Sequence, residues 1–191
     1  MFSPNVYQGA SSVIAYFPKA VWYDFWTYTP QFNVGQWLTL PAALDEIPIH
    51  ILGGSVIPRQ TPAMTSEQTK RNPFEIVFAL DMDSQAQGEL FLDDGEDLVV
   101  GQNATLIRFS ALSRRVCSEI VQDDWIGSSN LEVEKVSILG VYGAPGKVYV
   151  NGNETPIDYT LSAGTIRITG LKLPINKPFS ITWNPVHSVQ L

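Results

Sequence analysis

The stretch Val148-Tyr149-Val150-Asn151-Gly152-Asn153-Glu154 joins a β-branched and aromatic run to an Asn-Gly pair. Asn and Gly both tolerate positive φ, so this pair is the strongest short signal for the tight turn of a β-hairpin. Further on, Thr165-Ile166-Arg167-Ile168-Thr169 alternates polar and apolar residues, which places Ile166 and Ile168 on one face of a strand. Both patterns predict β-structure rather than helix.

Runs of this kind recur along the whole chain, and Gly, Pro, Asn or Asp interrupt them roughly every 8 to 12 residues. The sequence contains 13 prolines and 14 glycines, and it has no amphipathic stretch of helical length. It therefore predicts an all-β fold. The expected strands cover residues 13–17, 21–26, 36–40, 47–51, 74–80, 88–92, 105–111, 115–122, 131–139, 147–150, 165–169 and 179–183.

The strand pattern stops between residues 60 and 71. The segment Gln60-Thr61-Pro62-Ala63-Met64-Thr65-Ser66-Glu67-Gln68-Thr69 is polar, rich in Thr and contains a proline, as is typical of a connection. We therefore place a domain boundary there, between residues 1–65 and residues 66–191. Two consecutive antiparallel β-sandwich domains fit this division and the spacing of the strands.

Composition excludes several classes of function. Twelve basic and nineteen acidic residues give a net charge of −7, and no basic cluster is visible, so we expect no nucleic-acid partner. The longest apolar runs are far shorter than the roughly 18 residues that span a bilayer, so we expect no membrane span in this chain. Cys117 has no partner for a disulfide, and neither His50 nor His187 has a second ligand at metal-binding spacing. We expect no metal and no cofactor.

Two acidic patterns could carry chemistry. Asp93-Asp94-Gly95-Glu96-Asp97 could form a calcium loop or a catalytic pair, but Asp-Gly after a strand more commonly forms a hairpin turn. Asp24 lies among aromatic residues in Trp22-Tyr23-Asp24-Phe25-Trp26-Thr27. We interpret it as a carboxylate that binds the backbone of a nearby turn.

Two further residues are candidates for contact with sugars. Trp125 lies in a polar run, so of the five tryptophans we expect this one to be exposed, and it is a candidate sugar contact. Asn103-Ala104-Thr105 is an acceptor sequence for N-glycosylation, which makes Asn103 a candidate for modification.

Several segments in order resemble one enzyme family. They are Ala15-Tyr16-Phe17-Pro18, Trp22-Tyr23-Asp24-Phe25-Trp26-Thr27, Trp37-Leu38-Thr39-Leu40-Pro41-Ala42-Ala43-Leu44-Asp45 and Ile47-Pro48-Ile49-His50-Ile51-Leu52-Gly53-Gly54-Ser55-Val56-Ile57-Pro58. Together they resemble the region that follows the catalytic barrel in α-glucosidases of glycoside hydrolase family 31, such as lysosomal α-glucosidases, maltases and sucrases. Arg71-Asn72-Pro73-Phe74 and Phe91-Leu92-Asp93-Asp94-Gly95-Glu96 follow in the same order.

The resemblance implies a proximal β-sandwich (1–65) and a distal β-sandwich (66–191). The family's nucleophile lies in a Trp-x-Asp-Met-Asn-Glu type motif, and the sequence around Asp24 departs from it at every position after the aspartate. The resemblance therefore implies no catalytic residue here. It implies a role in supporting the absent catalytic barrel of a retaining enzyme that hydrolyses maltose-like oligosaccharides, with α-glucan bound through that barrel. Residues expected to contact the barrel are Trp22, Tyr23, Trp37, His50, Gly53 and Gly54.

The family favours a secretory, lysosomal or vacuolar location. It also predicts that the chain without the barrel exposes an apolar patch and self-associates. The alternative, from another class, is a free-standing carbohydrate-binding β-sandwich module for starch-like glucans. That alternative requires an exposed platform of two or more aromatic side chains.

Overall fold

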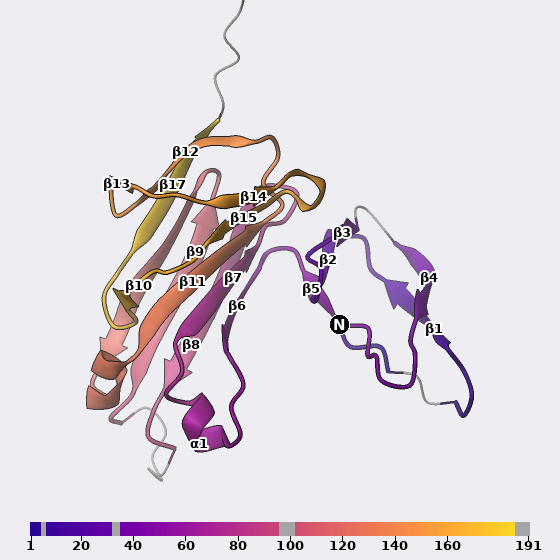
Figure 1. The fold of residues 1–191 in the computed structure, drawn as a ribbon, viewed down its shortest axis with the longest axis horizontal. Coiled ribbons are helices and arrows are strands. Elements are labelled where there is room, and N and C mark those ends of the chain that lie inside the picture. The colour runs from indigo at the N-terminus through magenta and orange to yellow at the C-terminus, as the bar shows by residue number, and fades with distance from the viewer. Residues whose placement is uncertain (5–6, 32–34, 96–101, 186–191) are drawn as a thin grey trace, which may run out of the picture.

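The structure is a computed structural model that describes residues 1–4, 7–31, 35–95 and 102–185. Its strands form a small N-terminal unit and a large sandwich, and Figure 1 shows the two standing side by side. The N-terminal unit contains β1 (Ser12–Phe17), β2 (Trp22–Asp24), β3 (Pro30–Gln31), β4 (Gln36–Pro41) and β5 (His50–Leu52). The prediction of an all-β chain is confirmed.

The large sandwich begins at β6 (Ser55–Gln60). It continues through α1 (Ser66–Thr69), β7 (Phe74–Ala79), β8 (Gln85–Leu92), β9 (Thr105–Leu112), β10 (Arg115–Asp123), η1 (Ile126–Asn130), β11 (Glu132–Leu139), β12 (Pro145–Val150), β13 (Asn153–Glu154), β14 (Asp158–Thr160), η2 (Leu161–Ala163), β15 (Thr165–Ile168), β16 (Leu173–Pro174) and β17 (Ser180–Pro185).

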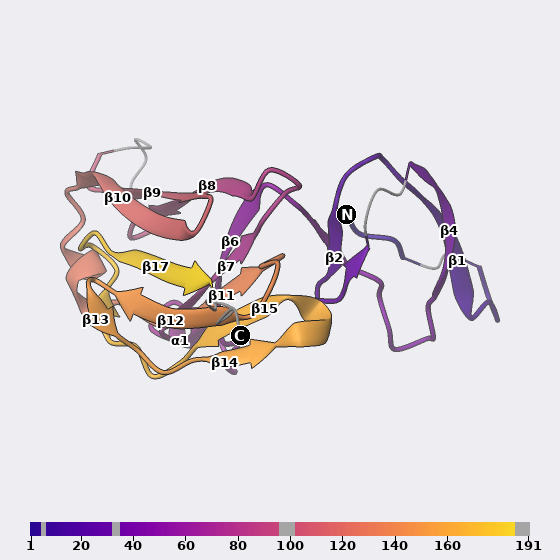
Figure 2. The ribbon, with the colours of Figure 1, turned by 90° about the horizontal axis from the view of Figure 1, so that it is seen from above.

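One hydrogen-bonded sheet makes up this sandwich, in the order β13-β12-β17-β10-β9-β8-β6-β7-β11-β15-β14, with β16 beside β11. The sheet folds over on itself, so β8, β9 and β10 lie on one side of the core and β12, β14 and β15 on the other (Figure 2). Pairing between the described strands is antiparallel except for β7 with β11 and the single pair that joins β6 to β8.

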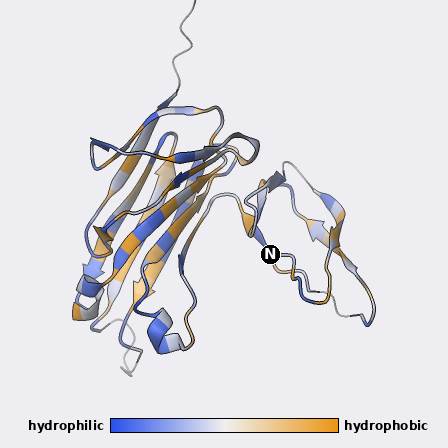
Figure 3. Ribbon diagram, in the orientation of Figure 1, coloured by the Kyte–Doolittle hydropathy of each residue, from blue (hydrophilic) through white to orange (hydrophobic). Residues whose placement is uncertain are grey.

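The sandwich encloses a single apolar core because its strands alternate. In β7, Ile76 and Phe78 point into that core, while Val77 and Ala79 point to the opposite face. Figure 3 shows hydrophobic and hydrophilic positions interleaved along these strands. The hairpin predicted at Asn151-Gly152 is confirmed, since β12 pairs with β13 and the two residues have φ of 49° and 83°.

The N-terminal unit consists of two small sheets, β1-β4 and β3-β2-β5. Phe17, Leu40 and Trp22 form a separate small core between them. In Figures 1 and 2 the sheet β3-β2-β5 lies nearer the large sandwich, and β1-β4 lies on the far side.

β6 lies on the N-terminal side of the expected domain boundary, yet it pairs with β7 from Ser55 to Gln60. The hydrogen-bonded sheet of the sandwich therefore already includes residues 55–60. A division of the domains at residue 65 stays a prediction.

Candidate functional site

The outer face of the β1-β4 sheet is apolar and exposed. Ile14, Tyr16 and Trp37 are 66%, 47% and 68% exposed, and Tyr16 lies directly opposite Trp37 across the two strands. The two rings are 5.4 Å apart, with their planes tilted by 57°. Alternate residues of the same strands, Ala15, Phe17 and Leu40, are buried on the inner face. We call Ile14, Tyr16 and Trp37 the outer face.

Of the six residues expected to contact a barrel, Trp37 alone is exposed. Trp22 packs edge-on against Phe17 with ring centroids 5.5 Å apart, and its Nε1 donates to the carbonyl of Pro18. Tyr23 is fully buried, and its hydroxyl donates to the carbonyl of Leu80 over 2.6 Å. Burial raises the pKa of Tyr23 well above its ordinary value, so the hydroxyl keeps its proton.

The pair Gly53-Gly54 makes the turn from β5 to β6, and both glycines are half-buried. A Cβ on Gly53 would lie 3.0 Å from the carbonyl oxygen of Leu80 and 3.1 Å from that of Val21. Gly54 has a φ of 92°, which side chains rarely adopt. The two glycines therefore allow the N-terminal unit to approach the sandwich closely.

His50 is 4% exposed and packs edge-on against Phe17, with ring centroids 4.8 Å apart. Its Nδ1 is buried without a hydrogen-bond partner among the described residues. Burial lowers the pKa of His50, the nearby Asp24 opposes that shift, and the positive amino terminus adds to it. The imidazole is therefore neutral at physiological pH.

A cleft of about 600 Å³ lies within the N-terminal unit. Asp24, Trp26 and Gln31 line it from the β3-β2-β5 side, together with Asp45 and Glu46 from the segment that precedes β5. Its apolar lining comes from Leu40, Pro41, Ile47 and Pro48, and His50 also lines it.

Asp24 stabilises the turn that carries Trp26. Its Oδ1 accepts hydrogen bonds from the backbone amides of Trp26 and Thr27, at 2.9 and 2.7 Å, and from the Thr27 hydroxyl at 2.9 Å. The interpretation of Asp24 as a carboxylate bound to the backbone of a turn is confirmed. Such a carboxylate positions backbone rather than attacking a substrate.

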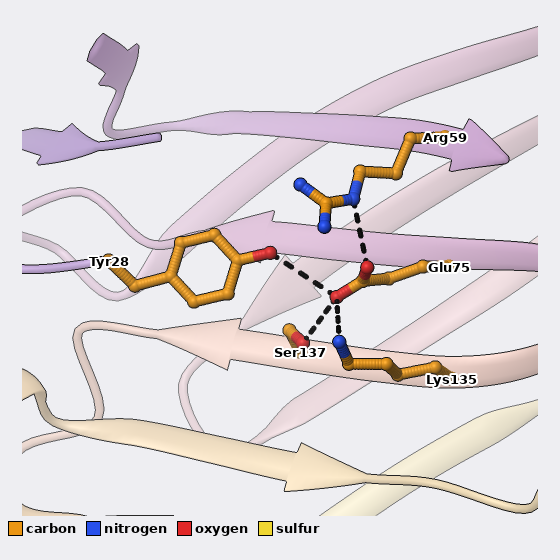
Figure 4. Close-up of polar contacts among 5 residues, drawn as sticks. All are labelled: Tyr28, Arg59, Glu75, Lys135 and Ser137. Carbon is orange, nitrogen blue, oxygen red and sulfur yellow. Dashed lines mark hydrogen bonds and ion pairs between the residues drawn. The ribbon is translucent and has the colours of Figure 1, made fainter. Parts of the chain in front are cut away.

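Glu75 joins the N-terminal unit to the sandwich, because four other side chains converge on its carboxylate at the junction (Figure 4). Its carboxylate accepts from Arg59 Nε at 2.8 Å, Lys135 Nζ at 2.9 Å and Ser137 Oγ at 2.8 Å, all from the sandwich. The hydroxyl of Tyr28, which belongs to the N-terminal unit, donates to the same carboxylate over 3.2 Å.

Aromatic and apolar contacts surround this carboxylate. The guanidinium of Arg59 lies 5.2 Å from the ring centroid of Phe25, and that of Arg167 lies 5.3 Å from the ring of Tyr28. A shared apolar cluster brings Val21, Tyr23, Tyr28 and Ile51 against Val77, Ala79 and Leu139 of the sandwich. The side chains at the junction are therefore fixed by packing and by charge together.

The expectation that Trp125 is the exposed tryptophan is wrong, because Trp26 and Trp37 are 66% and 68% exposed whereas Trp125 is half-buried. Trp125 is half-buried against the core of the sandwich, and a Cβ on Gly127 would lie 2.3 Å from its ring. A sugar contact through Trp125 stays a prediction.

Asn103 is exposed at a φ of 53°, beside Ala104 and Thr105, which are buried. Its modification also stays a prediction. His187 and the Glu96-Asp97 part of the acidic cluster lie outside the described residues.

Ile14, Tyr16 and Trp26 are exposed, although none of them was predicted to be exposed from the sequence. Alternation in the strands at residues 12–17 and 36–41 was the available signal, because it sets Ile14 and Tyr16 on the face opposite Ala15 and Phe17. In the described part of the chain, no group of three or more His, Cys, Asp or Glu side chains could hold a metal ion. None of the described helices is long and apolar enough to cross a membrane.

Comparison with known proteins places these features in a family. Residues 1–57 match the model of the glycosyl hydrolase family 31 C-terminal domain. Glucoamylase 1 of Schwanniomyces occidentalis is 38% identical over 192 residues, which cover 95% of this chain and 19% of the relative. Lysosomal alpha-glucosidase of Mus musculus is 31% identical over 206 residues, covering 96% of this chain and 21% of the relative.

The fold agrees with these similarities. A crystal structure of the glucosidase II alpha subunit superposes with a TM-score of 0.80 at 25% identity, over 95% of this chain and 22% of that one. The chain spans about a fifth of the length of the curated relatives it matches. By sequence and by fold, the chain is similar to enzymes of glycoside hydrolase family 31, and its residues 1–57 match the C-terminal domain of that family.

Proposed function

We propose that this chain is a non-catalytic region of a retaining α-glucosidase, and that it supports that enzyme's catalytic barrel. The enzyme hydrolyses the α-glucosidic bonds of maltose-like oligosaccharides, as the names of its glucoamylase and α-glucosidase relatives suggest. The chemistry belongs to the barrel, because a retaining glycosidase needs two carboxylates about 5 Å apart across the scissile bond. The sequence around Asp24 is the one that most resembles the family's nucleophile motif. The carboxylate of Asp24, however, accepts hydrogen bonds from the backbone amides of its own turn.

The outer face is the observation that carries this proposal. Nine of the sixteen large hydrophobic side chains that are exposed in the described residues come from residues 1–54. Within this set, Tyr16 and Trp37 lie side by side on the β1-β4 sheet, and contiguous exposed apolar surface marks an interaction site. The nine are Phe2, Tyr7, Ile14, Tyr16, Trp26, Trp37, Leu44, Ile47 and Leu52.

The test is made in the full-length enzyme that contains this chain. Replacing Ile14 and Trp37 together by Ser removes apolar surface without touching the small core. We expect heat inactivation of maltose hydrolysis to become about tenfold faster, equivalent to roughly 1.4 kcal/mol of lost contact. The matched control places Ser at Leu112 and Ile126, two apolar residues of the sandwich that are also largely exposed. Equal half-lives for the two double variants would refute the proposal.

A carbohydrate-binding module is the second candidate function, and the adjacent exposed rings of Tyr16 and Trp37 favour it. Their planes are tilted by 57°, so the two rings do not form a flat platform for successive sugars. Calorimetric titration of the chain with maltoheptaose separates the two candidates. A heat of binding at millimolar sugar that is lost in the Trp37→Ser variant would support the binding module.

A further inference from the structure

The cleft of the N-terminal unit has an unbalanced charge. Carboxylates of Asp24, Asp45 and Glu46 line it, and no Lys or Arg side chain is among the described residues that line it. Oδ1 of Asp24 is occupied by three donors of its own turn, whereas Asp45 and Glu46 are exposed. The amino terminus, which donates to the backbone carbonyl of His50, adds one positive charge nearby, so the three carboxylates leave a negative excess that favours a cationic occupant.

Trp26 supplies an aromatic surface in the same cleft. The side chain is 66% exposed, yet it is held in place by its neighbours. Its ring packs edge-on against Phe25 at 4.9 Å, and its Nε1 donates to the carbonyl of Ile47 over 3.4 Å. An indole fixed in this way loses little entropy when a ligand stacks on it.

His50 adds a polar group from within the unit. It lines the cleft, it is 4% exposed, and its Nδ1 lacks a partner among the described residues. Because burial lowers the pKa of His50, the neutral ring adds no positive charge that would repel a cation.

We propose that this cleft binds an arginine side chain from the catalytic domain of the same protein. The inference rests on the proposed function, because about four-fifths of a protein like the curated relatives lies outside this chain and includes that domain. A guanidinium stacks flat on an indole and pairs in a planar, two-pronged manner with a carboxylate, whereas the ammonium of lysine is a compact point charge that lacks both planar geometries. A neutral sugar would leave the carboxylates uncompensated.

The chain already uses this arrangement at its own junction. Arg59 stacks on Phe25 at 5.2 Å while its Nε binds the carboxylate of Glu75 at 2.8 Å. An aromatic ring, a carboxylate and a guanidinium thus combine on the other side of the same unit. The cleft offers the first two of these groups to an occupant from outside the chain.

The test uses the 191-residue chain with N-acetyl-arginine amide as the probe, at constant ionic strength, followed by tryptophan fluorescence and by NMR. We expect saturable binding, at least threefold weaker binding of N-acetyl-lysine amide, and further weakening by added salt. Asp45→Asn with Glu46→Gln should weaken the arginine probe at least fivefold, and Trp26→Ala should abolish the fluorescence change. All three side chains are exposed, so these variants are expected to fold.

Asp158→Asn, which neutralises an exposed carboxylate of the sandwich, is the matched control and should bind like the unchanged chain. Equal binding of the arginine and lysine probes, absence of saturation, or displacement of the arginine probe by maltoheptaose would overturn the inference. None of these results alters the test of the proposed function, because that test leaves Asp45, Glu46 and Trp26 unchanged and is read in the full-length enzyme.

Discussion

Glu75 lies where the two parts of the molecule meet, and it is the acceptor for donors from both. Burial alone would raise the pKa of its carboxyl group. Hydrogen bonds from Lys135 and Ser137, together with the positive charges of Arg59 and Lys135, outweigh that effect and hold the pKa below its ordinary value. The side chain is 12% exposed, so solvent screens these interactions only weakly.

Glu75→Gln should lower the free energy of unfolding by about 3 kcal/mol at neutral pH, because it leaves Arg59 and Lys135 half-buried without a counter-charge. The folded pKa lies below the unfolded value, so this contribution is complete above pH 4.5 and is lost as the pH falls through the folded pKa. Urea unfolding from neutral to acidic pH should show the difference between the two proteins shrinking.

Glu154→Gln provides the control for that experiment. Its pair with Lys147 is more than half exposed on both sides, so we expect no measurable change in the free energy of unfolding. A stability difference between the unchanged protein and the Glu75→Gln variant that stayed constant into acid would contradict the assignment of charge to this junction.

Single residues were predictable from sequence where their partners are close along the chain. Asp24 binds the amides of Trp26 and Thr27, two and three residues away, and an acid beside a turn already suggests such bonds. Trp125 shows the opposite case. Its neighbours Asp123 and Asp124 are exposed and suggested an exposed ring, but the core that half-covers it is built from strands distant in sequence.

Strands, like single residues, were predictable from sequence where the signal lies within one segment of the chain. β9 and β10 alternate clearly, and the sequence placed them within one residue of their observed ends. β6 was missed because Pro58 and Arg59 interrupt its apolar pattern, and a strand with proline is usually demoted. Its position between β7 and β8 depends on pairing across the sheet, which periodicity in one segment does not encode.

The parallel contact of β6 and β8 depends on a missing side chain. A Cβ on Gly88 would lie 2.5 Å from the carbonyl oxygen of Val56 and 2.9 Å from its Cβ. Gly88→Ala should therefore push the two strands apart and lower the free energy of unfolding by about 2 kcal/mol. Chemical denaturation measures this directly.

Gln87→Ala, on the preceding exposed position of the same strand, is the control and should change stability by no more than about 0.5 kcal/mol. If both variants are equally stable, the close approach of β6 and β8 is not what requires glycine.

Taken as a whole, the chain combines a sandwich with an enclosed apolar core and an N-terminal unit whose outer face is apolar and exposed to solvent. In the absence of the barrel, the chain should self-associate through Ile14, Tyr16 and Trp37, because burying such surface is favourable by about 25 cal/mol per Å². Sedimentation velocity should show a mass that rises with concentration, and Ile14→Ser with Trp37→Ser should restore the monomer. A monomer at every concentration would count against this prediction.

The passage from β5 to β6 has a mechanical consequence. Only Gly53 and Gly54 separate the last strand of the N-terminal unit from a strand in the interior of the large sheet, and Gly53 is packed against two carbonyl groups. The connection therefore contains no flexible segment. We expect a force on the outer face to be transmitted to the interior strands of the sheet, because no hinge lies between the two parts. We therefore expect the two parts to move as one rigid body, with no flexible linker between them for a protease to cut.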